Sequence, residues 1–347
     1  MRAPAELRPI RIAVMSFAHT HAETFIRLLQ NHENIELLAS DPGPHAPGEL
    51  RGRAYAKELG VNYVDSYDEL LLWQPHGVII TSENARHRAN VELAAAAGAD
   101  ILCEKPLAAT LEDGLAIRDA VERAGVRLMV AFPVRFASTF TKLKANYDAG
   151  LLGKIISVRG NNNGKLPTER SWFTDPALSG GGAIVDHVVH IADLLEGLKG
   201  SAPLAVTAIS NRTLHADRAQ AETSGLVTIT YDDGTIAAID CSWTQADTAP
   251  TWGGVRLVVA GTEGTVDIDF FGPRAKGLLT ESGKPLELPY GANFTDTLLR
   301  TFVDAVRNGT QAQPDVEVGL RTLRIVLAAQ ESVRSGRTIA IDEAASA

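Results

Sequence analysis

Two acidic residues and a histidine stand on one predicted helix, directly after three consecutive glycines. Asp186 and His190 are four positions apart and share a helical face, and Asp193 lies on that face a turn later. Histidine titrates near neutrality, so this pair suits reversible proton transfer, and the glycines let backbone and substrate approach closely. Lys105 ends a predicted parallel strand, where its ammonium can stabilise a developing alkoxide. Together these residues suit the oxidation of a carbinol carbon.

The first third of the chain alternates between short apolar runs and helical patterns. Ile10 to Met15 begins the series, Leu128 to Ala131 ends it, and short turns join the segments. This alternation is the signature of a doubly wound parallel sheet. After it, consecutive strand-like runs with tight turns predict a mostly antiparallel sheet. We therefore expect an α/β protein with a dinucleotide-binding Rossmann domain over residues 1–132. A C-terminal α/β domain with a large open sheet should follow over residues 133–347, for substrate binding and oligomerisation.

The turn after the first strand departs from the usual Gly-x-Gly-x-x-Gly of a dinucleotide-binding fold, because Ser16 to His21 contains no glycine. Thr20 and Glu23 have the spacing of a capping box, and free N–H groups at the helix start can still hold a phosphate. From this turn alone, a bound cofactor and a domain that has lost its cofactor are equally open. We also hypothesise that His19 or His21 donates a hydrogen bond to the pyrophosphate.

Asp41 ends the second predicted strand, roughly 20 residues after the turn, where a carboxylate binds the adenosine ribose of NAD. Pro42, Gly43 and Pro44 follow it, so no arginine stands next to it in sequence to receive the 2′-phosphate of NADP. The sequence therefore favours NAD over NADP. The alternative is an aspartate that only begins a turn before proline.

Three further motifs carry a family resemblance. Thr81-Ser82-Glu83-Asn84 leads to His87, Glu104-Lys105-Pro106 follows the fifth strand, and Gly180-Gly181-Gly182-Ala183-Ile184-Val185-Asp186 leads to His190. Together they resemble the glucose–fructose oxidoreductase, inositol dehydrogenase and MocA family, in element order from about Ile10 to Ile341. The resemblance implies an NAD-dependent oxidoreductase acting on a hydroxyl or ketone of a sugar, inositol or related polyol.

The resemblance also implies roles for individual residues. It makes Lys105, Asp186 and His190 catalytic. With the turn, it predicts cofactor contacts by Phe17, Ala18, His19, Thr20, His21, Asp41, Thr81, Ser82, Asn84, His87, Glu104 and Lys105. Substrate contacts are expected from Lys105, Arg135, Trp172, Asp186, His187 and His190. Trp172 forms either a sugar-stacking wall or part of the core, and His187 either extends the substrate site or covers it.

Two other functions stay open. A lyase or glycoside-cleaving enzyme that oxidises its sugar transiently would use the same catalytic residues, and net NADH formation separates it from a dehydrogenase. A sugar-sensing regulatory protein with a degenerate nucleotide site is favoured by the missing glycines and opposed by Lys105, Asp186 and His190. No bound metal is expected, because His19 and His21 are two positions apart, which suits no familiar zinc spacing.

Charge and composition exclude other classes of protein. The formal net charge is −9 and the chain has no run of Lys or Arg, which argues against nucleic acid. The only cysteines, Cys103 and Cys241, are far apart, as is usual in a reducing compartment. Met1 to Pro9 lacks the apolar stretch of a signal peptide, and Val91 to Ala99 is too short to span a bilayer. We expect a cytoplasmic protein with no membrane contact, and the family resemblance implies a homodimer or homotetramer.

Overall fold

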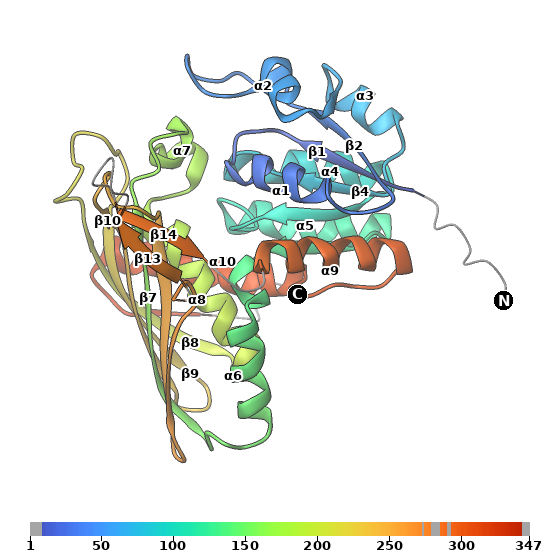
Figure 1. Ribbon diagram of the computed structural model, residues 1–347. Helices are drawn as coiled ribbons and strands as arrows, with labels where there is room; N and C mark the ends of the chain where they lie inside the picture. The colour runs from blue at the N-terminus through green and yellow to red at the C-terminus, as the bar shows by residue number, and fades with distance from the viewer. Residues whose placement is uncertain (1–8, 273, 279–284, 290–292, 342–347) are drawn as a thin grey trace, which may run out of the picture.

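The computed structural model describes residues 9–272, 274–278, 285–289 and 293–341. Most of the N-terminal segment on which the expected absence of a signal peptide rests lies outside these residues. Two large sheets organise the described chain, a six-stranded sheet in the N-terminal part and a seven-stranded sheet in the C-terminal part (Figure 1). The predicted α/β fold with two sheets is thereby confirmed.

The N-terminal sheet is parallel, with the strand order β3-β2-β1-β4-β5-β6. The second and third strands are added on one side of β1 and the next three on its other side. This is the doubly wound arrangement that binds dinucleotides at the carboxyl ends of its strands. Its strands are β1 (Ile10–Met15), β2 (Ile35–Ser40), β3 (Asn62–Tyr63), β4 (Gly77–Ile80), β5 (Asp100–Glu104) and β6 (Leu128–Ala131). Its helices are α1 (His21–Leu29), α2 (Gly52–Leu59), α3 (Tyr67–Leu72), α4 (His87–Ala96) and α5 (Leu111–Ala124).

Three neighbouring strands of this sheet are buried along their whole length. Every residue of β4, β5 and β6 is buried, as expected of a parallel sheet. Helices α3 and α5 start where Ser66 and Thr110 accept hydrogen bonds from backbone N–H groups in the first turn. Gly125, with φ of 65°, ends α5 in the left-handed conformation that glycine adopts easily. These boundaries bring the carboxyl ends of the strands to one edge.

The C-terminal sheet has the order β12-β11-β7-β10-β9-β8-β15. β10 runs parallel to β7, and the other neighbours are antiparallel, so the prediction of a mostly antiparallel sheet is confirmed. Its strands are β7 (Ile155–Lys165), β8 (Pro203–Asn211), β9 (Ser224–Tyr231), β10 (Ile236–Gln245), β11 (Gly253–Gly261), β12 (Thr265–Asp269) and β15 (Ile339–Ala340). A separate hairpin pairs β13 (Arg274–Leu278) with β14 (Pro285–Pro289).

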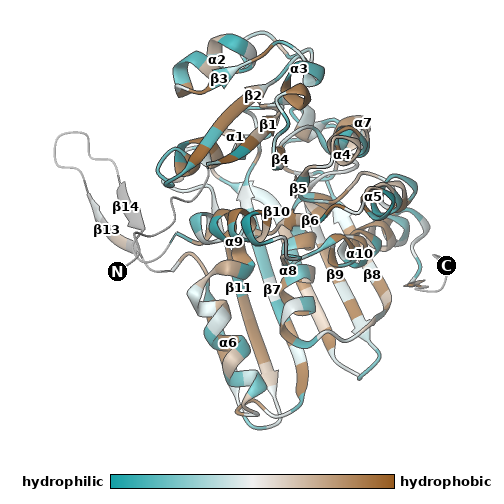
Figure 2. Ribbon diagram, turned by 90° about the vertical axis from the view of Figure 1, so that its right-hand side faces the viewer, coloured by the Kyte–Doolittle hydropathy of each residue, from teal (hydrophilic) through white to brown (hydrophobic). Residues whose placement is uncertain are grey.

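Helices cover one face of the C-terminal sheet, as Figure 2 shows for α6 (Ser138–Asp148), α8 (Ala183–Lys199) and α10 (Val316–Ser335). Burial alternates along β9, so alternate side chains face these helices. The other face carries apolar side chains that are at least half exposed, namely Ile209, Leu226 and Ile236. Ile209 and Leu226 are directly paired neighbours in the sheet, whereas Ile236 pairs with Thr230 farther along, so polar residues interrupt the apolar patch on this face.

The two sheets are joined at several points. The chain crosses between them through the short helix η2 (Pro133–Phe136), and α9 (Phe294–Asn308) returns to pack against α1 and the core beside β1. Helix α10 contacts α5, α8 and β8 and so bridges both parts. Within the described ranges, no helix combines the length and the apolar composition needed to cross a bilayer.

Candidate active site

The carboxyl ends of β1, β4 and β5 bring three of the predicted motifs together. Thr81 joins the first two: its Oγ1 donates to the Ser16 carbonyl at 2.7 Å, and its own carbonyl accepts from the His19 N–H at 2.8 Å. β5 ends at Glu104, whose fully buried carboxylate accepts from His21 Nδ1 at 2.8 Å. The turn after β1, the segment after β4 and the end of β5 therefore form one site.

Helix α8 points Asp186 toward this edge, and the glycine triplet determines where the helix starts. A Cβ atom at Gly182 would lie 2.0 Å from the Glu222 carbonyl oxygen, so only glycine fits there. The Glu222 carboxylate accepts from the N–H groups of Gly182 and Ile184 at 2.9 and 3.1 Å, and so caps the helix. The sequence predicted that the glycines let a substrate approach the backbone closely. In the structure, the group that lies close to Gly182 is the protein's own Glu222 carbonyl.

Asp186 is held on both carboxylate oxygens. Lys105 Nζ lies 2.5 Å from Oδ1, and Trp243 Nε1 on β10 donates to Oδ2 at 3.1 Å. Burial raises the pKa of Asp186, but the Lys105 ammonium and the neighbouring His187 ring outweigh burial and hold that pKa well below its usual range. Asp186 is therefore a fixed anion that positions the Lys105 ammonium.

His190 lies one helical turn after Asp186 and is partly exposed. Its Nδ1 is buried without a hydrogen-bond partner in the described chain, and Phe132 packs against the ring at a centroid distance of 6.1 Å. Burial, reinforced by the Lys105 ammonium, holds the pKa of His190 well below its usual value. A neutral imidazole next to a fixed ammonium can accept a proton from a hydroxyl.

His187 lies behind Asp186 and is fully buried. Its Nδ1 donates to the Asn162 carbonyl at 2.8 Å, which fixes the ring. Its Nε2 lies 3.1 Å from Asp186 Oδ2 without forming a hydrogen bond. This contact is an ion pair only when the His187 ring carries a proton on both nitrogens. In this arrangement His187 supports Asp186, and a substrate contact by His187 stays a prediction.

Arg135 and Trp172 also engage protein groups. Arg135 lies 2.7 Å from the carboxylate of the buried Asp193, whose pKa burial raises to about 6. Trp172 is 3% exposed, stacks on Phe173 at 3.9 Å and donates from Nε1 to the Ala18 carbonyl at 2.9 Å. Of the two readings of Trp172, this geometry favours the core. Substrate binding by Arg135 and Trp172 stays a prediction.

The turn after β1 keeps a sharp bend without glycine. Ser16, at the first glycine position, has φ of 75°, the left-handed conformation that glycine usually supplies. The predicted capping box is wrong, because the Thr20 side chain accepts no hydrogen bond from the described residues. Glu23 instead accepts from Tyr55 at 2.6 Å and from Arg27 at 2.8 Å. The His19 ring, and not Thr20, accepts from the first N–H group of α1, that of His21.

Three potential metal ligands meet beside this turn. The ligand atoms of His19, His21 and Glu104 lie within 4.8 Å of one another. His19 Nδ1 accepts from the His21 N–H at 3.1 Å, so the proton of the neutral ring sits on Nε2, which faces Glu104. Burial lowers the pKa of His19 to about 3, which keeps the ring neutral. His19 Nε2 is therefore a hydrogen-bond donor, and the absence of a bound metal stays a prediction.

The segment after β4 is anchored mainly by backbone carbonyls. His87 is fully buried, and its two ring nitrogens lie 3.0 and 3.2 Å from the carbonyls of Pro106 and Ser82. Asn84 Nδ2 donates to the Ser179 carbonyl at 2.7 Å, which ties this segment to the C-terminal part. These contacts shape the edge, and cofactor contacts by Asn84 and His87 stay predictions.

Several polar atoms at the edge have no partner in the described residues, which fits a polar ligand there. Buried Ser82 Oγ, Glu83 Oε2 and Asn84 Oδ1 make no hydrogen bond, like Nδ1 of His190. Because buried polar atoms are nearly always paired, three orphans in one segment indicate a site for an additional polar group. The first N–H groups of α1, those of His21 and Ala22, are already bonded to His19 Nδ1 and to the His19 carbonyl. A dinucleotide laid along this edge would supply partners for the unpaired atoms.

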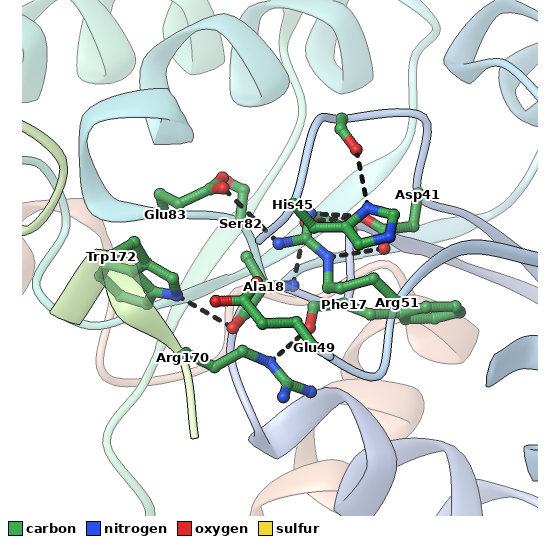
Figure 3. A network of polar contacts seen from close by, with 12 residues as sticks. Phe17, Ala18, Asp41, His45, Glu49, Arg51, Ser82, Glu83, Arg170 and Trp172 are labelled. Atoms are coloured by element: carbon green, nitrogen blue, oxygen red, sulfur yellow. Dashed lines mark hydrogen bonds and ion pairs between the residues drawn. The ribbon is translucent and has the colours of Figure 1, made fainter. Parts of the chain in front are cut away.

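Asp41, directly after β2, forms an ion pair with Arg51. Arg51 comes ten positions later in sequence, and its Nη2 and Nε lie 2.6 and 2.7 Å from the two carboxylate oxygens (Figure 3). Burial raises the pKa of Asp41, but the two bonds from Arg51 outweigh burial and lower it. No arginine follows Asp41 immediately in sequence, but the loop between the two residues folds back and brings Arg51 to the carboxylate.

Sequence reasoning missed four residues that shape the site: Trp243, Glu222, Arg51 and Arg170. Arg170 donates from Nη2 to the Leu50 carbonyl at 3.1 Å and so fastens the C-terminal part over the loop before α2. The contacts of Trp243, Glu222 and Arg170 join segments at least 40 positions apart, and Arg51 returns to Asp41 through a loop of ten positions. No local spacing or periodicity marks them, so only the folded structure shows them.

The fold defines a class of protein, in which a doubly wound parallel sheet of the dinucleotide-binding type is joined to a second, mostly antiparallel sheet. Residues 17–132 match the oxidoreductase family with an NAD-binding Rossmann fold, and residues 140–267 match the GFO/IDH/MocA C-terminal domain. The chain belongs to the GFO/IDH/MocA family and is an NAD-binding oxidoreductase. The predicted family, enzyme class and cofactor are thereby confirmed.

Known relatives span most of the chain. The D-xylose 1-dehydrogenase (NADP(+)) 2 of Haloferax volcanii is 30% identical over 85% of this chain and 90% of its own. The 1,5-anhydro-D-fructose reductase of Ensifer adhaerens is 29% identical over 84% of this chain and 88% of its own. GenD2 from gentamicin A biosynthesis, solved in complex with NAD, superposes with a TM-score of 0.85 at 24% identity, over 99% of both chains. This last similarity concerns the fold.

Proposed function

We propose that the protein transfers a hydride between NAD and a carbinol or ketone carbon of a sugar, inositol or related polyol, with His190 as acid and base. The observation that carries this proposal is the position of His190, whose buried Nδ1 has no partner in the described chain, one helical turn from the Asp186 carboxylate that pairs with Lys105. The names of the relatives, which act on 1,5-anhydro-D-fructose and D-xylose, support a carbohydrate substrate.

In the oxidation direction, His190 takes the proton of the substrate hydroxyl while Lys105 stabilises the alkoxide that forms. Asp186 holds the Lys105 ammonium in place through the 2.5 Å contact. NAD, when bound, accepts the hydride that leaves the carbinol carbon. In the reduction direction His190 returns the proton to the carbonyl oxygen. The turn from Phe17 to His21, Asp41 and the segment from Thr81 to Asn84 would hold the cofactor.

We also propose that two chains pair through the open face of the C-terminal sheet, as a homodimer or within a homotetramer. The apolar patch of Ile209, Leu226 and Ile236 supports this assembly, because such patches are costly to leave in water. Ile209→Glu with Leu226→Glu should dissociate the assembly in analytical ultracentrifugation. The cytoplasm is the proposed location, since Cys103 and Cys241 are both free thiols.

The test of the function is NADH formation when the protein is incubated with NAD and a panel of polyols and aldoses. The proposal expects net NADH with at least one member of the panel. Elimination or glycoside cleavage without net NADH would instead favour the lyase, in which the hydride returns to the substrate. Binding of a sugar with no turnover and no dinucleotide binding would favour the regulatory protein. His76, exposed at the opposite end of β4, provides a matched control for substitutions of His190.

A further inference from the structure

The carboxylate of Asp41 already carries a full set of hydrogen-bond donors. Oδ1 accepts from Arg51 Nη2 at 2.6 Å and from Ser16 Oγ at 3.2 Å. Oδ2 accepts from Arg51 Nε at 2.7 Å and from the Gly52 N–H at 2.9 Å. An ionised carboxylate offers about four acceptor sites, so all of them are occupied. Asp41 and Arg51 are 3% and 5% exposed, so water does not compete for these bonds.

This saturation has a consequence for cofactor binding. A ribose with free hydroxyls donates to the carboxylate at the end of β2, so the adenosine ribose has to displace one of these donors. Glu83 offers Arg51 an alternative partner. Its Oε1 lies 3.6 Å from Arg51 Nη1, and its buried Oε2 has no partner in the described chain. Figure 3 shows the Arg51 guanidinium between Asp41 and Glu83.

A second arginine reaches the same place. Arg86 Nη1 lies 3.4 Å from Glu83 Oε1. A Cβ atom at Gly43 would lie 3.1 Å from Arg86 Nη1 and 3.6 Å from Arg51 Nη2, so the two guanidinium groups converge over Gly43. Two arginines thus face two carboxylates, and the charge of the cluster is balanced. A 2′-phosphate would add negative charge to this balanced cluster, which favours NAD in the unaltered protein.

We propose that Arg51 determines which dinucleotide binds, and that Asp41 excludes NADP mainly by holding Arg51. While the ion pair is intact, the guanidinium is withheld from a 2′-phosphate. Once Asp41 is removed, Arg51 and Arg86 together bind the 2′-phosphate of NADP. The inference rests on the NAD-binding part of the proposed function, with the adenosine ribose at the end of β2. It does not depend on His190 or on the identity of the substrate.

The experiment is a double-mutant cycle read by calorimetric titration with NADP and with NAD, which needs no substrate. Asp41→Ala should tighten NADP binding by about ten- to a hundredfold, the effect of a charge-assisted hydrogen bond. Asp41→Ala with Arg51→Ala should lose that gain. If Asp41 acted only by repelling the phosphate, the double variant would gain as much as Asp41→Ala, and the proposal would be overturned.

Matched variants keep the test decisive. Asp41→Asn keeps the size of the side chain, and it replaces Asp41→Ala in the same cycle if the alanine variant does not fold. Arg51→Lys keeps the charge but cannot bind two oxygens side by side, so it should retain only part of the gain in the Asp41→Ala background. If the unaltered protein bound neither dinucleotide, the proposed function would fail together with this inference. If NAD bound normally and the cycle were additive, only this inference would fail.

Discussion

The catalytic end and the adenosine end of the cofactor edge each contain an aspartate paired with a buried cation, yet they differ in what is left free. At the catalytic end, Lys105 and Asp186 are paired, while His190 is neutral and its Nδ1 has no partner among the described residues. At the adenosine end, every acceptor site of Asp41 is occupied. In our proposal, the catalytic end is organised for chemistry before any ligand arrives, whereas the adenosine end is rearranged by its ligand.

The largest expected effect is at the catalytic end. His190→Ala should lower turnover by roughly 10²–10⁴-fold, because a general acid–base residue contributes that much. Affinity for NAD should barely change, since His190 comes from the C-terminal part of the chain. Steady-state kinetics and calorimetry measure the two quantities separately. His76→Ala, on the opposite end of the sheet, should leave both near normal.

Removal of Lys105 should affect stability as well as turnover. Lys105→Ala leaves the partly buried Asp186 carboxylate without its cation, which should cost up to about 3–5 kcal/mol in the free energy of unfolding. Turnover should fall too, because the alkoxide loses its ammonium. Lys144→Ala is the control, since Lys144 pairs with Asp148 on the surface and such pairs contribute about 1 kcal/mol or less. Equal losses in urea unfolding for both variants would contradict the role of Lys105.

A substitution of Trp243 tests whether its hydrogen bond to Oδ2 helps to position the Asp186 carboxylate. Trp243→Phe removes the donor to Oδ2, so the pKa of Asp186 should rise. The acid limb of the turnover–pH profile should then move upward by about one pH unit, the size expected for a hydrogen bond to a charged group. Trp73→Phe, near the amino ends of the strands, should leave the profile in place. A lower melting temperature with an unmoved profile would make Trp243 a packing residue only.

His19 gives a smaller effect, through the dependence of stability on pH. Burial lowers its pKa to about 3, whereas the unfolded chain takes the proton near about pH 6.5. The unfolded state therefore binds more protons as the pH falls below about 6.5, and the native state loses stability, by at most about 1.4 kcal/mol per pH unit. His19→Gln should flatten this slope in urea unfolding between about pH 6.5 and pH 4. An unchanged slope would mean that His19 is not held neutral.

Local patterns predicted the elements of the first sheet. β1 and β6 begin and end at the predicted residues, because buried parallel strands are short apolar runs bounded by turns. The family resemblance implied that Lys105 and Asp186 act in one site, but their 2.5 Å contact was not predicted. One follows a strand whose carboxyl end must lie at the edge, and the other lies on a helix whose periodicity fixes its face.

Contacts of the adenosine end could not be predicted in the same way. Arg51 returns to Asp41 through a loop rich in proline and glycine, which has no periodicity to fix its path. Trp172 reaches the Ala18 carbonyl from more than a hundred residues away. The missing glycines were visible in the sequence, but the conformation that replaces them, with Ser16 at φ of 75°, depends on tertiary contacts such as the one from Thr81.

The most direct test of the central claim follows the hydride itself. Members of the polyol panel carrying deuterium on the carbinol carbons are incubated with the protein and NAD, and the label is located by mass spectrometry. The account predicts that deuterium from an active substrate appears in NADH, and that His190→Ala slows this transfer while NAD still binds. Deuterium that is lost to water, or turnover without any label in the reduced cofactor, would contradict it.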